Sequence, residues 1–139
     1  MDGHESWALG RLLLVAARLV EREWNALLAE RGLTHAGFLV LHVLDGGPRT
    51  QRELAAGTYV EEQTIRPVLD RLERDGHVTR RRDPADRRRV MVSRTERGGR
   101  AHAAVVTGDM AERIITDRVE DPEALRAELI RIITGIRGG

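Results

Sequence analysis

The chain has no cysteine and no lysine, and aromatic residues make up only 3% of its 139 positions. Without cysteine, the protein cannot form disulfides, thiolate nucleophiles, cysteine-ligated zinc sites or thiol redox sensors. No apolar run approaches the roughly 20 residues that a bilayer crossing needs, and the first residues lack the order of a secretory signal. We therefore expect a cytoplasmic protein with no membrane partner.

What the chain does contain is typical of a folded protein. Hydrophobic residues account for 41% of the sequence and charged residues for 32%. The length suits one domain, and the scarcity of aromatic side chains means that Leu, Val, Ile and Ala must build the core.

All 23 basic residues are arginine, and they are concentrated in the middle of the sequence. Residues 1–48 carry a net charge of −2, residues 49–100 carry +5, and residues 101–139 carry −2. Six arginines lie within the ten residues from Arg80 to Arg89. A positive middle between acidic flanks is typical of a centre that binds a polyanion.

The apolar pattern predicts helices at both ends of the chain. Apolar residues recur at three- and four-residue steps over 9–28, which predicts a first helix capped by Ser6 and ended by Gly32. Thr34 is expected to cap a second helix that closes at residues 45–48. One long helix is predicted over 95–119, although Gly98, Gly99 and Gly108 each weaken it by about 1 kcal/mol. A last helix should begin after Asp121.

The middle of the chain has the spacing of a helix-turn-helix followed by a hairpin. Two short helical patterns lie between Gln51 and Val78, separated by a few residues at 57–60. After Gly76 the pattern changes to a strand at 77–82, a turn at 83–89 and a second strand at 90–93. The predicted fold class is therefore mainly α, with a winged helix-turn-helix whose wing is a small β-hairpin.

Because the basic turn directly follows a helix-turn-helix, we expect it to contact nucleic acid while the second helix of the pair enters the major groove. A guanidinium holds a phosphate with two hydrogen bonds or enters a narrow, negative minor groove. An aspartate in the turn would fix the tip. A solvated hairpin tip without a partner is the alternative. The predicted contacts are Arg82, Asp86, Arg87, Arg88 and Arg89.

The second helix of the pair should present polar residues at its leading end. Gln63 and Arg66 are candidates for base readout, since Gln pairs bidentately with adenine and Arg with guanine. Alternatively, they touch phosphate or solvent only. The other DNA-binding candidates here are Gln51, Glu62, Thr64 and Arg71.

These segments resemble the MarR family of bacterial transcription regulators over nearly the whole chain. "GLTHAGFLVLHVL" is similar to the family's second helix, "QRELAAGTYVEEQTIRPVLDRLERDGHVTR" to its helix-turn-helix, and "DPADRRRVMVSRTERG" to its wing. The family's Asp-any-Arg pattern falls on residues 86–88, so the resemblance implies that Arg88 enters the groove and that Asp86 positions it. It also implies a homodimer with intertwined N- and C-terminal helices, and repression that an effector relieves.

We accordingly expect a regulator that binds a pseudo-palindromic operator in double-stranded DNA, with half-sites roughly 34 Å apart, and that associates with the bacterial nucleoid when bound. One domain spans 1–139. Residues 34–95 form its DNA-binding lobe, and residues 1–33 and 96–139 form its helical dimerisation region.

The sequence departs from the family pattern at two positions. His35 stands where family members usually carry proline after the threonine that opens the second helix. Pro67 lies in the recognition helix, where a proline in the interior costs about 3 kcal/mol. We therefore predict that this helix either starts late, with Thr64 as its cap, or is kinked.

A small-molecule site is predicted on the second helix. His35, Phe38 and His42 share one helical face, and we expect them, with Arg18 and Trp24, to bind a small aromatic or lipophilic effector. Alternatively, the histidines are satisfied at a helix boundary or a dimer interface.

Other functions have less support. Zinc sensing would need further ligands beside His42, and His102 has no second histidine one turn on, so we expect no metal or other cofactor. No motif places a nucleophile, a base and an orienting group together, so an enzyme is not expected. A winged-helix protein-interaction or architectural module without a ligand remains the open alternative.

Overall fold

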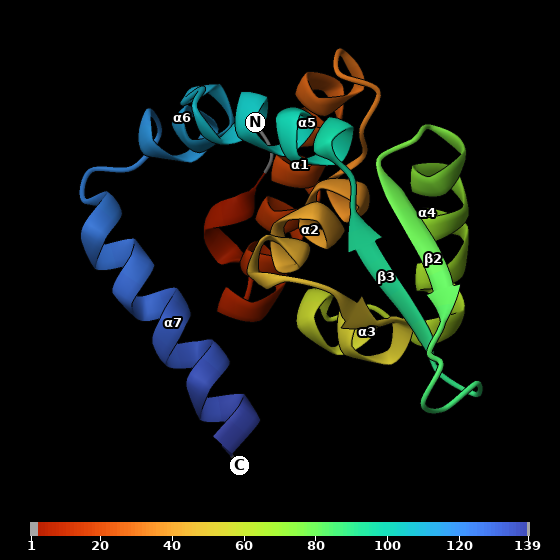
Figure 1. Ribbon diagram of the computed structural model, residues 1–139. Coiled ribbons are helices and arrows are strands. Elements are labelled where there is room, and N and C mark those ends of the chain that lie inside the picture. Colours follow the sequence, from red (N-terminus) through yellow and green to blue (C-terminus); the bar gives the residue numbers. More distant parts are fainter. Residues whose placement is uncertain (1–2, 139) are drawn as a thin grey trace. The chain divides into compact units, whose positions relative to one another are not determined.

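The computed structural model describes residues 3–138, in which seven α-helices and three short strands succeed one another (Figure 1). Short 3₁₀ helices lie at His4–Ser6 and Leu44–Gly46. The helices are α1 (Leu9–Ala29), α2 (His35–Val43), α3 (Gln51–Thr58), α4 (Glu62–Arg74), α5 (Glu96–Val106), α6 (Met110–Thr116) and α7 (Pro122–Gly138). The strands are β1 (Arg49–Thr50), β2 (Val78–Arg82) and β3 (Val90–Arg94).

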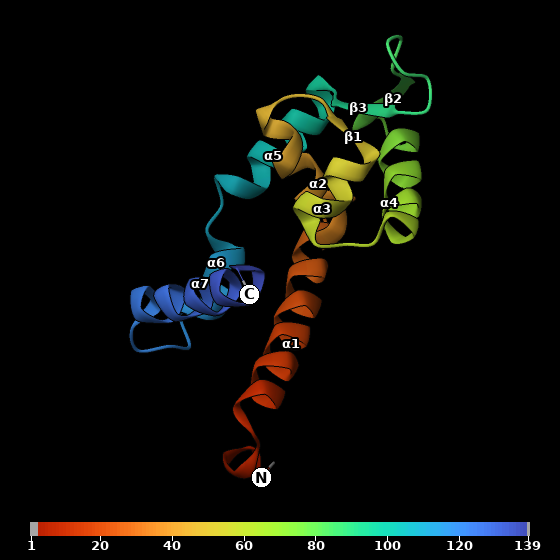
Figure 2. The same cartoon turned by 90° about the horizontal axis from the view of Figure 1, so that it is seen from below.

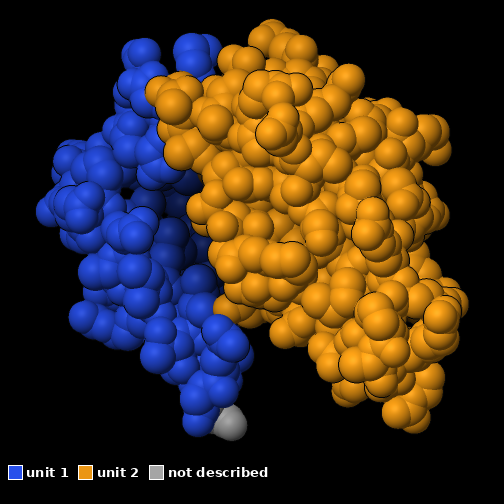
Figure 3. All heavy atoms as spheres, viewed as in Figure 1, with its two compact units in different colours: residues 1–23, 109–139 blue, residues 24–108 orange. Residues whose placement is uncertain are grey.

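The chain forms two compact units, which Figure 3 colours separately. Residues 24–108 form the central unit, and residues 1–23 with 109–139 form the terminal unit. Helix α1 contributes to both units.

The core of the central unit is aliphatic. Helices α2, α3 and α4 contact one another, and strands β2 and β3 close the core with one buried valine each. Val40, Leu41, Leu54, Ile65, Leu69 and Val92 are fully shielded from solvent. Burying such side chains is the main stabilising term in a fold of this size, at roughly 25 cal/mol per Å² of apolar surface. The full set of buried apolar residues is Leu28, Leu33, Val40, Leu41, Leu44, Leu54, Ala55, Ile65, Leu69, Leu72, Val78 and Val92.

The three strands form one antiparallel sheet in the order β1-β3-β2, with β1 before the helix pair in the chain and β2 and β3 after it. The register pairs Arg80 of β2 with Val92 of β3, and Arg49 of the short β1 with the same Val92. Figures 1 and 2 show the β2–β3 hairpin extending beside α4. The predicted class, a mainly helical winged helix-turn-helix, is confirmed. The sequence did not predict β1, because two residues carry no periodicity.

Capping residues set several helix boundaries as expected. The Thr34 hydroxyl accepts a hydrogen bond from the Gly37 amide at 3.1 Å, and the Asp121 carboxylate accepts one from the Ala124 amide at 3.0 Å. Ser6, in contrast, does not cap α1. It ends the first 3₁₀ helix and donates to the Gly3 carbonyl at 3.1 Å, and α1 begins at Leu9. The predicted Ser6 cap is therefore wrong.

The long helix predicted over 95–119 is divided in two. Helix α5 ends at Val106, and the Thr107 hydroxyl donates back to the Ala103 carbonyl at 2.9 Å. Gly108 follows outside any helix, and α6 begins at Met110. Glycine has the largest backbone entropy to lose in a helix, so the chain breaks there where packing does not offset that cost.

Gly98 has a different role. A Cβ at this position would overlap the carbonyl oxygen of His77, so only glycine allows α5 to approach the start of β2 so closely. The Thr95 hydroxyl accepts from the Gly98 amide at 3.0 Å and donates to the Gly76 carbonyl at 2.7 Å. This glycine joins α5 to the hairpin instead of merely weakening a helix.

Helix α4 begins at Glu62, with Glu61 as its N-cap residue, and runs unbroken through Pro67 to Arg74. The predicted late start, with Thr64 as the cap, is therefore wrong, and the alternative of a kink at Pro67 stays a prediction. Pro67 has no amide hydrogen, so the Gln63 carbonyl receives no helical bond from it. Ile65 and Leu69, on either side of Pro67, are fully buried, and this packing holds the helix together.

The terminal unit exposes much apolar surface in a single chain. Leu9 is 81% exposed, Leu14 66% and Ile136 76%, and the described residues of α6 and α7 include none that is buried. Exposed apolar side chains in this number mark an interaction surface.

Replacing Pro67 by Ala should stabilise the protein. The substitution restores an amide donor for the Gln63 carbonyl and removes the proline ring from the helix interior, so the free energy of unfolding should rise by about 1–3 kcal/mol. Urea unfolding followed by circular dichroism measures the change.

Pro122→Ala is the matched control, because Pro122 is the first residue of α7, where an amide would have no helical partner. That variant should unfold like the wild type. An unchanged or lower stability of the Pro67→Ala variant would contradict the account of α4.

Candidate nucleic-acid interface

Helix α3 is fixed at its start by a capping box. The Thr50 hydroxyl accepts from the Glu53 amide at 3.0 Å, and the Glu53 carboxylate accepts from the Thr50 amide at 2.8 Å. These hydrogen bonds lower the pKa of Glu53. At the other end, Tyr59 adopts a left-handed conformation with φ of 59°, which turns the chain into α4. The two helices are thereby joined by a turn at residues 59–61, as in a helix-turn-helix.

Helix α4 divides its residues between the core and solvent. Ile65, Leu69 and Leu72 are buried against the rest of the central unit. At the leading end, the candidates for DNA contact are exposed: Glu62, Gln63, Thr64 and Arg66. Gln51, the first residue of α3, is half-buried. Packing one face of α4 therefore presents its polar N-terminal turns outward.

The tip of the hairpin is an ordered turn. The Asp83 amide donates to the Arg89 carbonyl at 2.9 Å, and the Arg89 amide donates to the Asp86 carbonyl at 2.9 Å. The Asp83 carboxylate accepts from the Ala85 amide at 2.9 Å, as an aspartate typically does in a turn. The basic tip therefore has a defined backbone.

Asp86 holds Arg88. Its carboxylate accepts from the Arg88 backbone amide and from Nε, both at 3.1 Å, and from Nη2 at 3.3 Å. The guanidinium and the amide of Arg88 together lower the pKa of Asp86. Yet 91% of the Arg88 side chain is exposed. The arrangement presents a guanidinium to solvent while restricting where it points.

The other tip arginines are also tied to the turn. Arg82 Nη1 donates to the Arg87 carbonyl at 2.8 Å, and Arg89 Nη1 lies 3.9 Å from an Asp83 carboxylate oxygen. Surface ion pairs of this kind contribute little to stability, but they order the side chains they join.

The leading end of α4 and the hairpin tip lie at the same end of the central unit, as Figure 1 shows. We call this end of the central unit, with the exposed polar residues of α4 and the exposed arginines at 82 and 87–89, the basic face. A helix end beside a basic hairpin is the arrangement with which winged helices bind a duplex.

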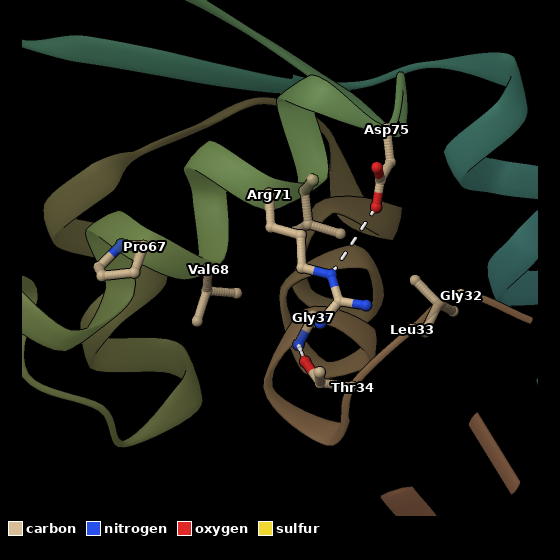
Figure 4. Close-up of a pocket in the computed structure, with 9 residues that line it drawn as sticks. Gly32, Leu33, Thr34, Gly37, Pro67, Val68, Arg71 and Asp75 are labelled. Atoms are coloured by element: carbon tan, nitrogen blue, oxygen red, sulfur yellow. Dashed lines mark hydrogen bonds and ion pairs between the residues drawn. The ribbon is translucent and has the colours of Figure 1, made fainter. Parts of the chain in front are cut away.

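Arg71 lies elsewhere. Its Nε is 3.8 Å from an Asp75 carboxylate oxygen, and in Figure 4 the side chain extends toward Thr34 and Gly37, at the start of α2. A shallow pocket of about 180 Å³ lies there between α2 and α4. It is lined by Gly32, Leu33, Thr34, Gly37, Pro67, Val68, Arg71, Leu72 and Asp75. The structure therefore does not bring Arg71 to the leading end of α4 with the other candidates.

The predicted effector residues form two separate ring contacts and not one cluster. The rings of Trp24 and His35 lie 5.0 Å apart, whereas Phe38 stacks at 6.0 Å on His42 further along α2. Arg18 belongs to the terminal unit. None of the five lines the pocket beside Arg71. Their role in binding an effector stays a prediction.

His102 is a residue whose role the sequence did not reveal. Its Nε2 lies 2.9 Å from Nδ1 of His42, and its ring stacks on Phe38 at 5.3 Å. It is buried, and burial lowers its pKa, with Arg94 and His42 adding to the effect. The partner lies 60 residues away on α2, so no local spacing could have indicated the pair.

Within residues 3–138, no group of three or more His, Cys, Asp or Glu side chains is arranged to hold a metal ion. Over the same range, no helix has the length and apolar character required to span a membrane.

Comparisons with known proteins agree with this geometry. A family model described as MarR family matches residues 31–89. The HTH-type transcriptional regulator SarZ of Staphylococcus epidermidis is 30% identical over 88 residues, which cover 63% of this chain and 60% of SarZ. The chain therefore matches about 60% of the length of this curated relative.

Solved structures match over nearly the whole length. A MarR variant from E. coli, crystallised with operator DNA, has a TM-score of 0.78 and 26% identity, covering 96% of this chain and 98% of that one. BpsR of Bordetella bronchiseptica, whose DNA binding is regulated by 6-hydroxynicotinic acid, has a TM-score of 0.77 and 27% identity, covering 93% and 98%.

The His42–His102 pair should make stability depend on pH. The pKa of His102 in the folded protein lies below its ordinary value of 6.5, so the fold favours the neutral ring. The stabilisation that this preference gives the fold is complete above the ordinary pKa and is lost as the pH falls below it. The free energy of unfolding should therefore decrease from pH 7 to pH 5. In a His102→Gln variant the decrease should be smaller, as chemical denaturation at each pH would show.

Three charged or titratable groups act on His102, namely His42, Arg94 and Asp45, and none of them is altered in that variant. His77, which is buried with a lowered pKa, leaves a residual decrease of the same sign. His4→Gln, at an exposed position, serves as the control. Equal pH dependence in the wild type and the His102→Gln variant would refute the assignment.

Proposed function

Because the chain belongs to the MarR family, we propose that it is a homodimeric transcriptional regulator that binds double-stranded DNA in a sequence-specific manner. We further propose that it represses its targets and that a small-molecule effector releases it. Its place of action is then the cytoplasm, where bacterial DNA lies.

One observation carries the proposal. Arg88 is 91% exposed and yet is held by three hydrogen bonds to Asp86, at the same end of the central unit as the exposed start of α4. If Arg88 only faced solvent, its hydrogen bonds to Asp86 would serve no function. A guanidinium that must enter a narrow groove gains pre-organisation, because less side-chain freedom is lost on binding.

The basic face suits both grooves of B-form DNA. The start of α4 enters the major groove, where Gln63 pairs with adenine and Arg66 with guanine. The hairpin tip reaches the adjacent minor groove, with Arg88 inside it and Arg87 and Arg89 at the phosphates. These contacts would position the protein and read the sequence at the same time.

The exposed apolar side chains of the terminal unit support a homodimer. Leu9, Leu14 and Ile136 are more than 60% exposed in one chain, and a second copy would cover them. Two copies related by a twofold axis present two basic faces, so the operator would be pseudo-palindromic with half-sites roughly 34 Å apart.

Effector control is supported by the likeness to BpsR. We propose that a small aromatic or lipophilic ligand binds near Trp24, His35, Phe38 and His42, with Arg18 as a further contact. A ligand that prefers one separation of the two recognition helices would shift the population toward or away from the DNA-binding form.

Removing the groove-inserting arginine should weaken DNA binding. For an operator selected from a random-sequence pool, Arg88→Ala should lower the affinity by about tenfold or more. Replacing Arg87, Arg88 and Arg89 together should also reduce the slope of log affinity against log salt concentration by about two to three. Fluorescence anisotropy at several salt concentrations measures both quantities.

Arg126→Ala, an exposed arginine on α7, is the control and should bind like the wild type. A random duplex of equal length should bind roughly 10³-fold more weakly than the operator. If the triple variant bound every duplex as the wild type does, the protein would be an interaction module and not a DNA-binding regulator.

Trp24 should report the effector. Trp7→Phe leaves Trp24 as the only tryptophan, and its ring already contacts His35. We expect at least one member of a panel of small aromatic acids to quench its fluorescence and to release the operator at the same concentrations. His35→Ala should weaken both effects. A panel without quenching or release would count against the proposed site.

A further inference from the structure

Arg80 differs from the exposed arginines at the hairpin tip because its guanidinium is largely shielded from solvent between two carboxylates. It lies in the middle of β2, and its side chain is 22% exposed. Its Nη2 donates to Asp70 at 2.6 Å and to Glu73 at 2.9 Å, and its Nε donates to Glu73 at 3.2 Å. The Arg80 backbone amide adds a bond to the other Glu73 oxygen at 3.3 Å. Four hydrogen bonds thus join the wing strand to the recognition helix.

These bonds outweigh the cost of covering the guanidinium. Burial by itself disfavours the charged form, but the bonds to Glu73 and Asp70 more than offset it and raise the pKa of Arg80. Charge-assisted bonds to two carboxylates are among the strongest that a side chain makes. The guanidinium of Arg80 therefore stays charged in the folded protein.

The link lies where apolar contact between the wing and the helix stops. Val78, at the start of β2, is buried in the core, but Thr79, Arg81 and Arg82 are exposed. From Val78 to the tip, Arg80 is the point at which β2 is tied to α4. Strand residues rise about 3.3 Å each, so the tip begins roughly 7 Å beyond this point. A small rotation of the paired β2–β3 hairpin beyond this point would move Arg88 away from its groove.

We propose that the Arg80–Asp70–Glu73 contact, which we call the wing clamp, positions the hairpin tip relative to α4, so that Arg88 reaches the minor groove while α4 occupies the major groove. Arg80 is thus a positioning residue that touches no DNA. The inference rests on the proposed function for its effect on binding, but the position of the tip is a property of the free protein.

The clamp predicts that Arg80 and Arg88 act as one unit. Arg80→Met keeps an unbranched stem about as long as the part of arginine up to Nε, and it removes the guanidinium with its charge. If the clamp places Arg88, Arg80→Met should weaken operator binding by about tenfold, and adding Arg88→Ala should then cost less than about twofold. If the two residues acted independently, the losses of operator affinity would multiply to about a hundredfold in the double variant. That multiplication would overturn the proposal.

Arg94→Met provides the matched control. Arg94 lies in β3 with a side chain 21% exposed, and it donates to Asp45 at 2.9 Å and to the Leu41 carbonyl at 3.1 Å. It ties the sheet to α2 and its end, not the wing to α4. In the Arg94→Met background, Arg88→Ala should still lower operator affinity by its full amount. Non-additivity with Arg94 as well would indicate a general loss of structure.

A second measurement needs no DNA. Since the chain has no cysteine, Ala56→Cys on α3 and Ala85→Cys at the tip create two unique sites for nitroxide labels, both exposed. Pulsed electron double resonance, with labelled chains diluted into unlabelled protein, should give a narrow distance distribution. Arg80→Met should broaden or shift it, and Arg94→Met should not.

A distribution unaffected by Arg80→Met would overturn the clamp even if the protein proved to bind DNA as proposed. Conversely, if Arg80→Met broadened the distance distribution but the protein did not bind DNA, the wing clamp would be supported and the proposed function rejected. Should Arg80→Met not fold, Glu73→Met, which removes three of the four bonds, carries the same two tests.

Discussion

Carboxylates keep the crowded arginines of the β2–β3 hairpin in place. Asp86 holds Arg88, Asp83 lies beside Arg89, and Asp70 with Glu73 holds Arg80. Each pair reduces the repulsion within the run and fixes a direction for one guanidinium. The run therefore contains two kinds of arginine: Arg80, whose side chain is largely shielded from solvent, and the paired but exposed arginines of the tip, which a polyanion can reach. Without these acidic partners the arginine side chains would be less ordered and would repel one another more strongly.

The aliphatic core makes this arrangement possible. Ile65, Leu69 and Leu72 commit one face of α4 to the interior, so the opposite face and the leading end have to meet solvent. The same packing tolerates Pro67, whose missing amide would otherwise end the helix. Gly98 lets α5 approach the start of β2, where a larger residue would displace the hairpin. Local chemistry at the ends of the elements and burial in the middle thus determine where the basic face forms.

Local patterns in the sequence predicted the helices, their caps and the hairpin. They did not predict contacts between residues that lie far apart in the chain. The Thr34 and Asp121 caps, the helix pair and the hairpin each depend on residues a few positions apart, and the structure has them as expected. The break after α5 was missed because a glycine is tolerated or not according to packing that a sequence does not display. The late start predicted for α4 failed for the same reason, since buried neighbours outweigh the cost of Pro67. The His42–His102 pair and the wing clamp join positions on separate elements, and charge counting could only suggest that the arginines had a common partner.

The central claim is that the start of α4 and the hairpin tip occupy adjacent grooves of one duplex. Hydroxyl-radical footprinting on a selected operator tests it most directly, because these radicals report access to the minor groove. In each half-site we expect a protected minor-groove stretch about half a helical turn, roughly 17 Å, from the bases that α4 contacts. In the Arg88→Ala variant, at a protein concentration that saturates the operator, that protection should disappear. An identical footprint in both proteins, or no protected minor groove in the wild type, would contradict the account.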